Sequence, residues 1–260
     1  MNLPMMGRHR NIGGMVRRSR LAALLGVAAF VLTVGACRSR SEDRDESRQA
    51  AASPGPSAAA SSSASDTPTT AGRPRVVVLG DSLTAGLGLS TADSYPTLLQ
   101  RRLKESGFDF EVVNAGVSGD TSAGGLSRID WALQGDVRIL IVALGGNDGL
   151  RGLPPEQLQQ NLAQIIERAQ ARHIAVVLAG MEAPPNYGRE YIVSFHKVYP
   201  TLAKRYGVAL VPFLLQGVAG TDTLNQADGI HPTAAGARIV ADNVWAVLRP
   251  VVERQVRPGS

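Results

Sequence analysis

Five residues in four short segments of this chain have the types needed for acyl transfer by a serine. They are Ser82 within Gly-Asp-Ser-Leu, Gly116, Asn147, and Asp228 three residues before His231. A serine hydroxyl is a poor nucleophile until an imidazole accepts its proton. The imidazole in turn needs a carboxylate that holds its tautomer and stabilises its cation. Backbone N–H groups beside glycine, together with an asparagine amide, can stabilise the developing oxyanion.

Strands and helices alternate around these segments. Short continuous apolar runs, typical of strands buried on both faces, occupy residues 76–79, 110–113, 139–144, 174–178 and 208–211. Helical patterns occupy residues 95–104, 129–133, 156–172, 195–206 and 234–248, the last one between Thr233 as N-cap and Pro250. This alternation predicts a mainly parallel sheet with helices on both faces, which binds ligands at the carboxyl ends of its strands.

Each of the four segments taken alone has a simpler explanation. Gly-Asp-Ser and the region of Asn147 are typical of turns, and Asp228 with His231 could form a capped turn or part of a metal site. Their appearance in order at successive predicted strand ends is hard to attribute to turn chemistry. We therefore expect them to converge in one active site. Asp81 and Asp148 lie beside site residues, and we expect both to bond loop backbone.

These four segments resemble the four sequence blocks of the SGNH or GDSL hydrolases, and the resemblance covers residues 75–248. It implies a flavodoxin-like three-layer α/β/α sandwich with a five-stranded parallel sheet. It also implies Ser82 as nucleophile, His231 as base and Asp228 as its partner. The implied oxyanion hole consists of the Ser82 and Gly116 backbone N–H groups and the Asn147 side chain.

Within the family, residues 83–88, 184–188 and 195–206 are most similar to bacterial periplasmic arylesterases and multifunctional thioesterase–lysophospholipases. The expected activity is hydrolysis of carboxylic esters or thioesters with aryl or short-to-medium acyl groups, with no metal or organic cofactor. One alternative is a carbohydrate O-acetyl esterase of the same family. An alternative of another class is a lipid-anchored flavodoxin-like binding module.

The N-terminal region has the features of an export signal. Three arginines precede the apolar run 21–34, and small residues lead to Cys37, the only cysteine. Residues 34–37 resemble a bacterial lipobox, which implies a lipid anchor on Cys37 and an envelope protein facing the periplasm. A single membrane-spanning helix is disfavoured because the run is shorter than the about 20 residues that a span needs. Met15 is an alternative start to Met1.

Composition divides the chain into a signal at residues 1–37, a tether at 38–72 and a hydrolase domain at 73–260. Residues 50–71 contain no aromatic or large aliphatic side chain, so this segment cannot bury enough apolar area to order itself. Residues 1–40 contain seven arginines and no acidic residue, whereas residues 73–260 carry 18 basic and 17 acidic residues. The domain therefore lacks the basic excess that nucleic-acid binding requires.

Overall fold

The structure is a computed structural model that describes residues 72–256. The predictions of a signal peptide, a lipid anchor on Cys37 and a tether therefore lie outside the described residues. Between residues 72 and 256, no helix combines the length and the hydropathy that a bilayer crossing requires.

A single sheet of five parallel strands forms the middle layer, in the order β2-β1-β3-β4-β5. The strands are β1 (Arg75–Gly80), β2 (Glu111–Gly116), β3 (Val137–Ala143), β4 (Ala175–Ala179) and β5 (Ala209–Val211). The central strands β1 and β3 are almost entirely buried, which explains their continuous apolar runs. The α/β class and the five-stranded parallel sheet expected from the sequence are confirmed.

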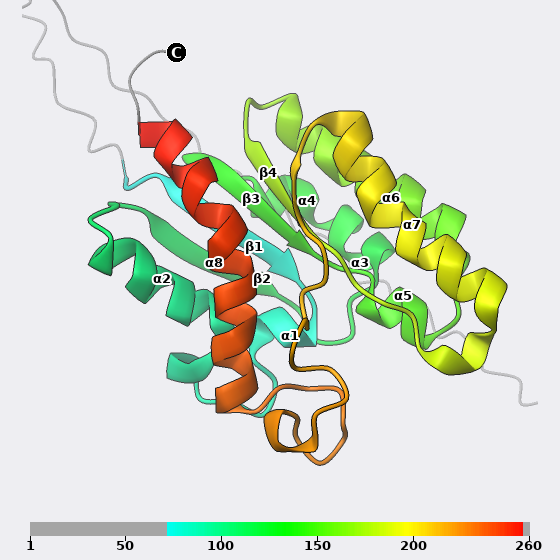
Figure 1. Ribbon diagram of the computed structural model, residues 1–260. Helices are drawn as coiled ribbons and strands as arrows, with labels where there is room; N and C mark the ends of the chain where they lie inside the picture. The colour runs from blue at the N-terminus through cyan, green and yellow to red at the C-terminus, as the bar shows by residue number, and fades with distance from the viewer. Residues whose placement is uncertain (1–71, 257–260) are drawn as a thin grey trace, which may run out of the picture. The chain divides into compact units, whose positions relative to one another are not determined.

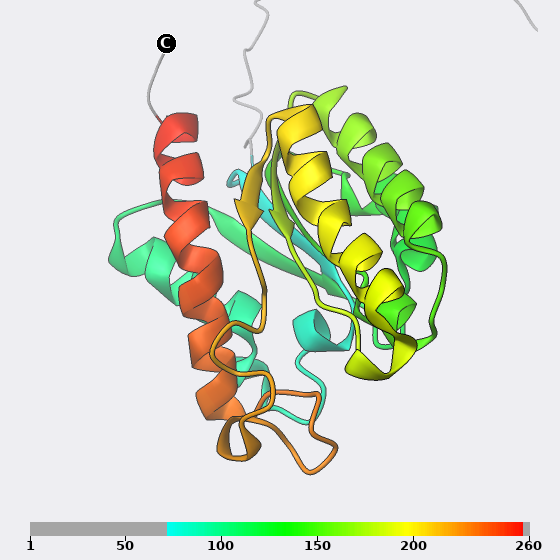
Figure 2. The same ribbon diagram turned by 45° about the vertical axis from the view of Figure 1, so that its right-hand side comes forward.

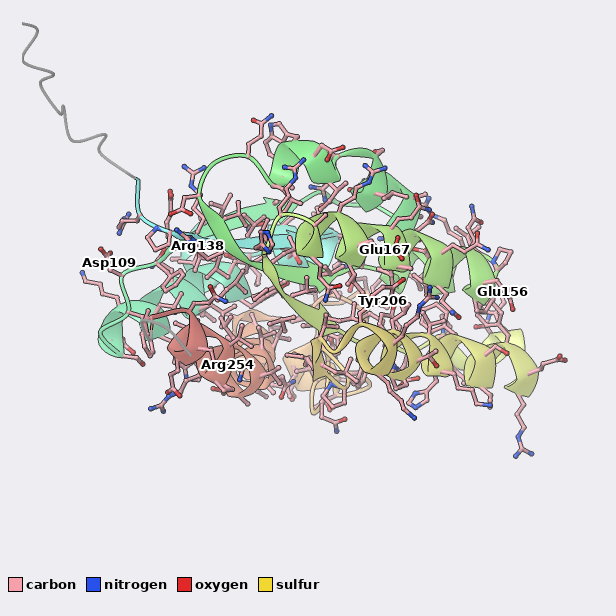
Figure 3. The ribbon with its side chains drawn as sticks, turned by 90° about the horizontal axis from the view of Figure 1, so that it is seen from above. Asp109, Arg138, Glu156, Glu167, Tyr206 and Arg254 are labelled. Atoms are coloured by element: carbon pink, nitrogen blue, oxygen red, sulfur yellow. The ribbon has the colours of Figure 1, made fainter. Side chains whose placement is uncertain are left out.

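Helices cover both faces of this sheet (Figures 1 and 2). The helices are α1 (Ser82–Ala85), α2 (Tyr95–Glu105), α3 (Ser122–Ser127), α4 (Ile129–Ala132), α5 (Gly146–Leu150), α6 (Pro155–Gln170), α7 (Arg189–Tyr206) and α8 (Ala234–Val256). Helices α2 and α8 pack together on one face, and α6 packs between α3 and α7 on the other. Where α6 meets α7, the Tyr206 hydroxyl donates a hydrogen bond to Glu167 (Figure 3).

Two helices extend beyond their predicted bounds. Helix α8 continues past Pro250 to Val256, although proline removes one backbone hydrogen bond from a helix. Val251 and Val252, which follow this proline, are 3% and 0% exposed, so their burial offsets that loss. Helix α7 begins at Arg189, six residues before the predicted start, and it contains Pro200.

Strand β2 also runs further than its apolar residues indicate. The predicted strand ends at residue 113, but pairing with β1 continues to Gly116, which lies opposite Gly80. Asn114 is exposed within this edge strand, so the apolar pattern breaks there while the backbone ladder does not. Gly116 is therefore a strand residue and not a loop residue.

The sheet places the candidate residues at its topological switch point. The chain passes from β1 to β2 on one side and then returns to β3 on the other side of β1. Ser82 follows β1 and Asn147 follows β3, so these two residues leave adjacent strands at the same edge. Open parallel sheets bind ligands in the crevice that such a reversal creates.

Candidate active site

Ser82 is the first residue of α1, directly after the buried strand β1. Asp81 caps this short helix, because its Oδ1 accepts a hydrogen bond of 3.0 Å from the Leu83 N–H. The tight strand-to-helix turn presents the Ser82 hydroxyl at the carboxyl edge of the sheet. The Ser82 backbone N–H lies at the helix N-terminus, where N–H groups have no partner within the helix.

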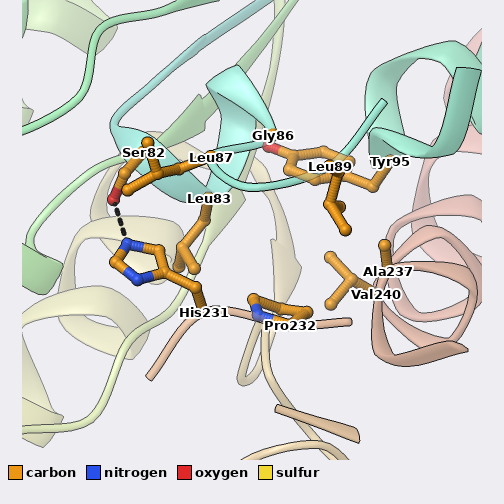
Figure 4. Close-up of a pocket in the computed structure, with 10 residues that line it drawn as sticks. All are labelled: Ser82, Leu83, Gly86, Leu87, Leu89, Tyr95, His231, Pro232, Ala237 and Val240. Carbon is orange, nitrogen blue, oxygen red and sulfur yellow. Dashed lines mark hydrogen bonds between the residues drawn. The ribbon is translucent and has the colours of Figure 1, made fainter. Parts of the chain in front are cut away.

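A continuous hydrogen-bond chain joins Ser82, His231 and Asp228. His231 Nε2 lies 2.8 Å from Ser82 Oγ (Figure 4). On the other side of the ring, His231 Nδ1 lies 2.7 Å from Asp228 Oδ2. The order carboxylate, imidazole, hydroxyl is the one that activates a serine as a nucleophile. The structure thus brings together three predicted site residues that are up to 149 positions apart in the sequence.

The loop that carries Asp228 and His231 is held by hydrogen bonds of its own. Asp228 Oδ1 accepts the backbone N–H groups of His231 and Ile230, each at 3.0 Å. The backbone bond from His231, with those from its ring and from Ile230, lowers the pKa of Asp228 to about 2, so this carboxylate is charged at neutral pH.

Gln226 connects the histidine loop to the serine loop. Its Nε2 donates to the Leu87 carbonyl at 2.7 Å and to the Pro232 carbonyl at 3.0 Å. Its backbone N–H donates to the His231 carbonyl at 2.7 Å. Gln226 therefore helps set the distance between His231 and Ser82, and its sequence context did not indicate this role.

Asn147 lies in α5, immediately after β3, and its side chain lines the same cleft as Ser82 and His231. Its amide Nδ2 donates to the Asp120 carbonyl at 2.9 Å and makes a longer bond of 3.4 Å to Asp81 Oδ2. The shorter bond orients the amide. The longer bond is weak, so its hydrogen is available to an anionic oxygen in the cleft.

Three tyrosines on or beside α7 hold the segment around Asn147 in place. Each donates its hydroxyl to a backbone carbonyl there: Tyr199 to Leu144 at 3.0 Å, Tyr191 to Leu153 at 2.8 Å, and Tyr187 to Leu150 at 2.7 Å. These tyrosines were not among the residues predicted from the sequence. Tyr191 and Tyr199 are eight residues apart, a spacing that places both on one face of α7, and this is the signal that could have found them. Tyr187 lies in the 3-10 turn before the helix.

Gly116 is not placed as the sequence analysis expected. Its N–H donates to Asn114 Oδ1 at 3.0 Å, and Gly116 does not line the cleft. A Cβ at this position would lie 2.3 Å from the Ala85 nitrogen, so glycine is needed where α1 crosses β2. The extension of β2 explains the difference, because strand pairing turns this N–H away from Ser82.

Gly119 occupies the place expected for Gly116. It lines the cleft with Ser82 and Asn147, and its φ of +86° is one that glycine adopts readily. Its N–H has no hydrogen-bond acceptor within residues 72–256. Gly119 is the next glycine after Gly116, three residues further along the chain, so a shift of three residues would have identified it.

The cleft above these residues has a volume of about 560 Å³ and is mostly apolar. Its larger apolar side chains include Leu83, Leu87, Leu150, Met181, Phe213, Leu215 and Ile230. Leu87, Leu150 and Ile230 are 48%, 45% and 44% exposed. Such a lining fits acyl or aryl groups better than highly charged ones. A second space of about 10 Å³ lies between Ser82, Tyr95 and Val240 (Figure 4).

The roles expected for the two neighbouring aspartates are confirmed. Asp81 accepts the Leu83 N–H, and Asp148 accepts the backbone N–H of Ser122 at 2.8 Å and its hydroxyl at 2.5 Å. Both carboxyl groups are buried. Burial raises the pKa of Asp81 from 3.8 to about 6, although the bond from Leu83 favours its charged form.

The raised pKa of Asp81 predicts that this residue lowers stability at neutral pH. The folded protein binds the Asp81 proton more tightly than the unfolded chain, so stability falls as the pH rises through 6 and is regained towards pH 4. In Asp81→Asn this contribution is absent. We expect the variant to gain about 1–2 kcal/mol in unfolding free energy relative to wild type between pH 5 and pH 8. Urea unfolding at both pH values measures this; a pH-independent difference would contradict it.

The fold and this arrangement are those of a serine hydrolase: a serine hydroxyl, an imidazole and a carboxylate lie in line beside hydrogen-bond donors. Within the described range, no three His, Cys, Asp or Glu side chains are grouped so that they could hold a metal ion. Residues 78–239 match the GDSL-like Lipase/Acylhydrolase family. The chain belongs to this family and is an enzyme that hydrolyses ester bonds.

Individual relatives agree with this assignment. Esterase TesA of Pseudomonas aeruginosa is 49% identical over 178 residues, which are 68% of this chain and 89% of the relative. Thioesterase 1/protease 1/lysophospholipase L1 of Escherichia coli K12 is 40% identical over 178 residues, 68% of this chain and 84% of the relative. A crystal structure of TesA has a TM-score of 0.66 at 48% identity and covers 68% of this chain and 99% of that chain.

Proposed function

We propose that this enzyme hydrolyses carboxylic esters and thioesters with aryl or short-to-medium acyl groups through Ser82, His231 and Asp228. The observation that carries the proposal is the chain of hydrogen bonds of 2.7 and 2.8 Å from Asp228 to Ser82, which opens onto an apolar cleft. Without a base in contact, a serine hydroxyl would not attack a carbonyl carbon at a useful rate.

In the first half of the reaction, Ser82 attacks the carbonyl carbon while His231 Nε2 removes its proton. Asp228 accepts the Nδ1–H of the ring and stabilises the imidazolium that forms. The new oxyanion receives hydrogen bonds from the backbone N–H groups of Ser82 and Gly119 and from the Asn147 amide. Gly119 replaces Gly116 in this role, because the Gly116 N–H is bonded to Asn114.

The first half ends when the tetrahedral intermediate collapses: the bond from the carbonyl carbon to the leaving oxygen or sulfur breaks, His231 protonates the leaving alcohol or thiol, and an acyl-enzyme on Ser82 remains. In the second half, a water molecule attacks the carbonyl carbon of this acyl-enzyme. The same imidazole takes the proton of that water and returns it to Ser82 as the free acid leaves. The chain's own side chains perform each proton transfer in this scheme.

The substrate class rests on the lining of the cleft. Exposed leucine and isoleucine side chains at its mouth can cover an acyl chain or an aromatic leaving group. Relatives named esterase TesA and thioesterase 1/lysophospholipase L1 support esters and thioesters as the two classes to test.

We also propose a location in the cell envelope. The support is sequence alone: arginines, an apolar run and small residues before Cys37. A lipid anchor on Cys37 would hold the enzyme at a membrane facing the periplasm. Mass spectrometry of the mature protein from membranes tests this; an unmodified Cys37 would refute the anchor.

The proposed activity is tested by labelling and by a substrate profile. A fluorophosphonate should label the full-length protein once, at Ser82, and nitrophenyl esters and acyl thioesters with short-to-medium acyl chains should be turned over. Absence of labelling would refute the hydrolase mechanism and leave the binding module. Activity confined to acetylated glycans would favour the carbohydrate O-acetyl esterase.

A further inference from the structure

Arg128 lies between α3 and α4 and connects three segments that end at the candidate site. Its Nη2 donates to the Gly80 carbonyl at 2.9 Å, its Nη1 to the Ala115 carbonyl at 2.8 Å, and its Nε to Asp120 Oδ2 at 2.7 Å. Gly80 ends β1 two residues before Ser82, and Ala115 lies next to the end of β2. One guanidinium therefore joins the carboxyl ends of two adjacent strands.

The bond to Asp120 extends this connection to the other oxyanion donors. Asp120 directly follows Gly119, so holding its carboxylate also holds the backbone that carries the Gly119 N–H. The carbonyl of Asp120 is the acceptor of the shorter Asn147 amide bond, at 2.9 Å. Each proposed donor is thus linked closely to a group that Arg128 binds. Ser82 is two residues from Gly80, Gly119 directly precedes Asp120, and the Asn147 amide is bonded to the Asp120 carbonyl.

The surroundings favour a rigid contact. The side chains of Arg128 and Asp120 are each only 18% exposed. The guanidinium is planar and presents fixed donors in several directions, which suits acceptors on separate segments. A lysine ammonium is a single point and cannot reach the same three acceptors at once.

We propose that Arg128, held by Asp120, is a positioning residue that sets the geometry of the oxyanion hole. The inference rests on the proposed function, because it assigns Arg128 to the same site. Arg128 does not touch the substrate. It keeps the donors where the charge develops in the transition state, and such placement affects the rate more than it affects substrate binding.

The test compares Arg128→Lys and Arg128→Met with Arg138→Met in the full-length protein. Arg138 is an exposed arginine at the start of β3, paired with Asp136 and labelled in Figure 3, so it serves as a matched control. We expect kcat to fall about 10-fold in Arg128→Lys and about 10²-fold in Arg128→Met, with KM changed by less than about threefold. Arg138→Met should retain wild-type kinetics.

A double-mutant cycle with Asn147→Ala separates positioning from general stability. Asn147→Ala alone should lower kcat by about 10²–10³-fold, as loss of one oxyanion donor does. If Arg128 acts through the oxyanion hole, Arg128→Met should cost at least about fivefold less in the Asn147→Ala background than in wild type. Additive effects, or a kcat that falls only in proportion to the folded fraction, would overturn the proposal.

Failure of this inference can be told apart from failure of the proposed function. If wild type is neither labelled by a fluorophosphonate nor active on esters, the function itself fails. If wild type is active and Ser82-labelled while both Arg128 variants match Arg138→Met, only the role of Arg128 is refuted. If Arg128→Met does not fold, Arg128→Lys, which keeps the charge and most of the side chain, provides the same comparison.

Discussion

The Ser82→Ala variant is expected to lower kcat by about 10⁴–10⁶-fold, the range seen when a triad nucleophile is removed. No other hydroxyl within residues 72–256 lies in hydrogen-bond contact with His231 Nε2. The fold should be unaffected, because the Ser82 side chain bonds only to His231 while Asp81 caps α1. Initial rates on an aryl ester, with thermal unfolding of both proteins, measure the effect.

Ser127→Ala is the matched control for this substitution. Ser127 is exposed at the end of α3, and its hydroxyl donates to the Gly124 carbonyl of the same helix. It should keep wild-type activity and fluorophosphonate labelling, whereas Ser82→Ala should lose both. Labelling of Ser82→Ala at another residue, with activity above about 1% of wild type, would disprove Ser82 as the nucleophile.

The Asp228→Asn variant is expected to lower kcat by about 10²–10⁴-fold. An asparagine Oδ1 can still accept the N–H groups of Ile230 and His231, so the loop should keep its shape. The neutral amide, however, neither stabilises the imidazolium nor holds the ring tautomer that Ser82 needs. The side chain of Asp228 is 46% exposed, so water can replace part of the stabilisation that the carboxylate gives the imidazolium. We therefore expect a smaller loss of kcat than in Ser82→Ala.

The pH dependence makes this second prediction specific. Because the pKa of Asp228 is lowered to about 2, the wild-type carboxylate stays charged throughout the range from pH 5 to 9. The loss in Asp228→Asn should therefore appear at every pH in that range. Asp222→Asn, an exposed aspartate six residues earlier, is the control and should behave as wild type. Equal kcat in the two variants would remove Asp228 from the mechanism.

Local patterns in the sequence were enough to predict the fold class and to select the serine, histidine and aspartate that the structure brings into contact. Continuous apolar runs such as residues 139–144 indicate burial on both faces, and this property depends only on nearby residues. In a parallel sheet the carboxyl ends of the strands meet at one edge, so polar residues after each strand converge there. Ser82, Asn147 and His231 were found in this way.

The residues now proposed for the oxyanion hole were predicted only in part. Ser82 and Asn147 lie where they were expected, but Gly116 belongs to β2 and Gly119 lines the cleft in its place. The end of a strand is determined by how far its neighbour pairs with it, and β1 pairs with β2 as far as Gly80 and Gly116. An apolar pattern that stops at residue 113 does not contain that information.

The connections that hold the site together were visible only in the tertiary structure. Arg128 binds the carbonyl of Gly80, 48 positions away, and Gln226 binds that of Leu87, 139 positions away. A backbone carbonyl is present at every residue, so no residue type marks these acceptors in the sequence. The chemistry proposed for Ser82, His231 and Asp228 follows from side-chain identity, which the sequence by itself determines. Their support follows from backbone groups that only folding brings within reach of Arg128 and Gln226.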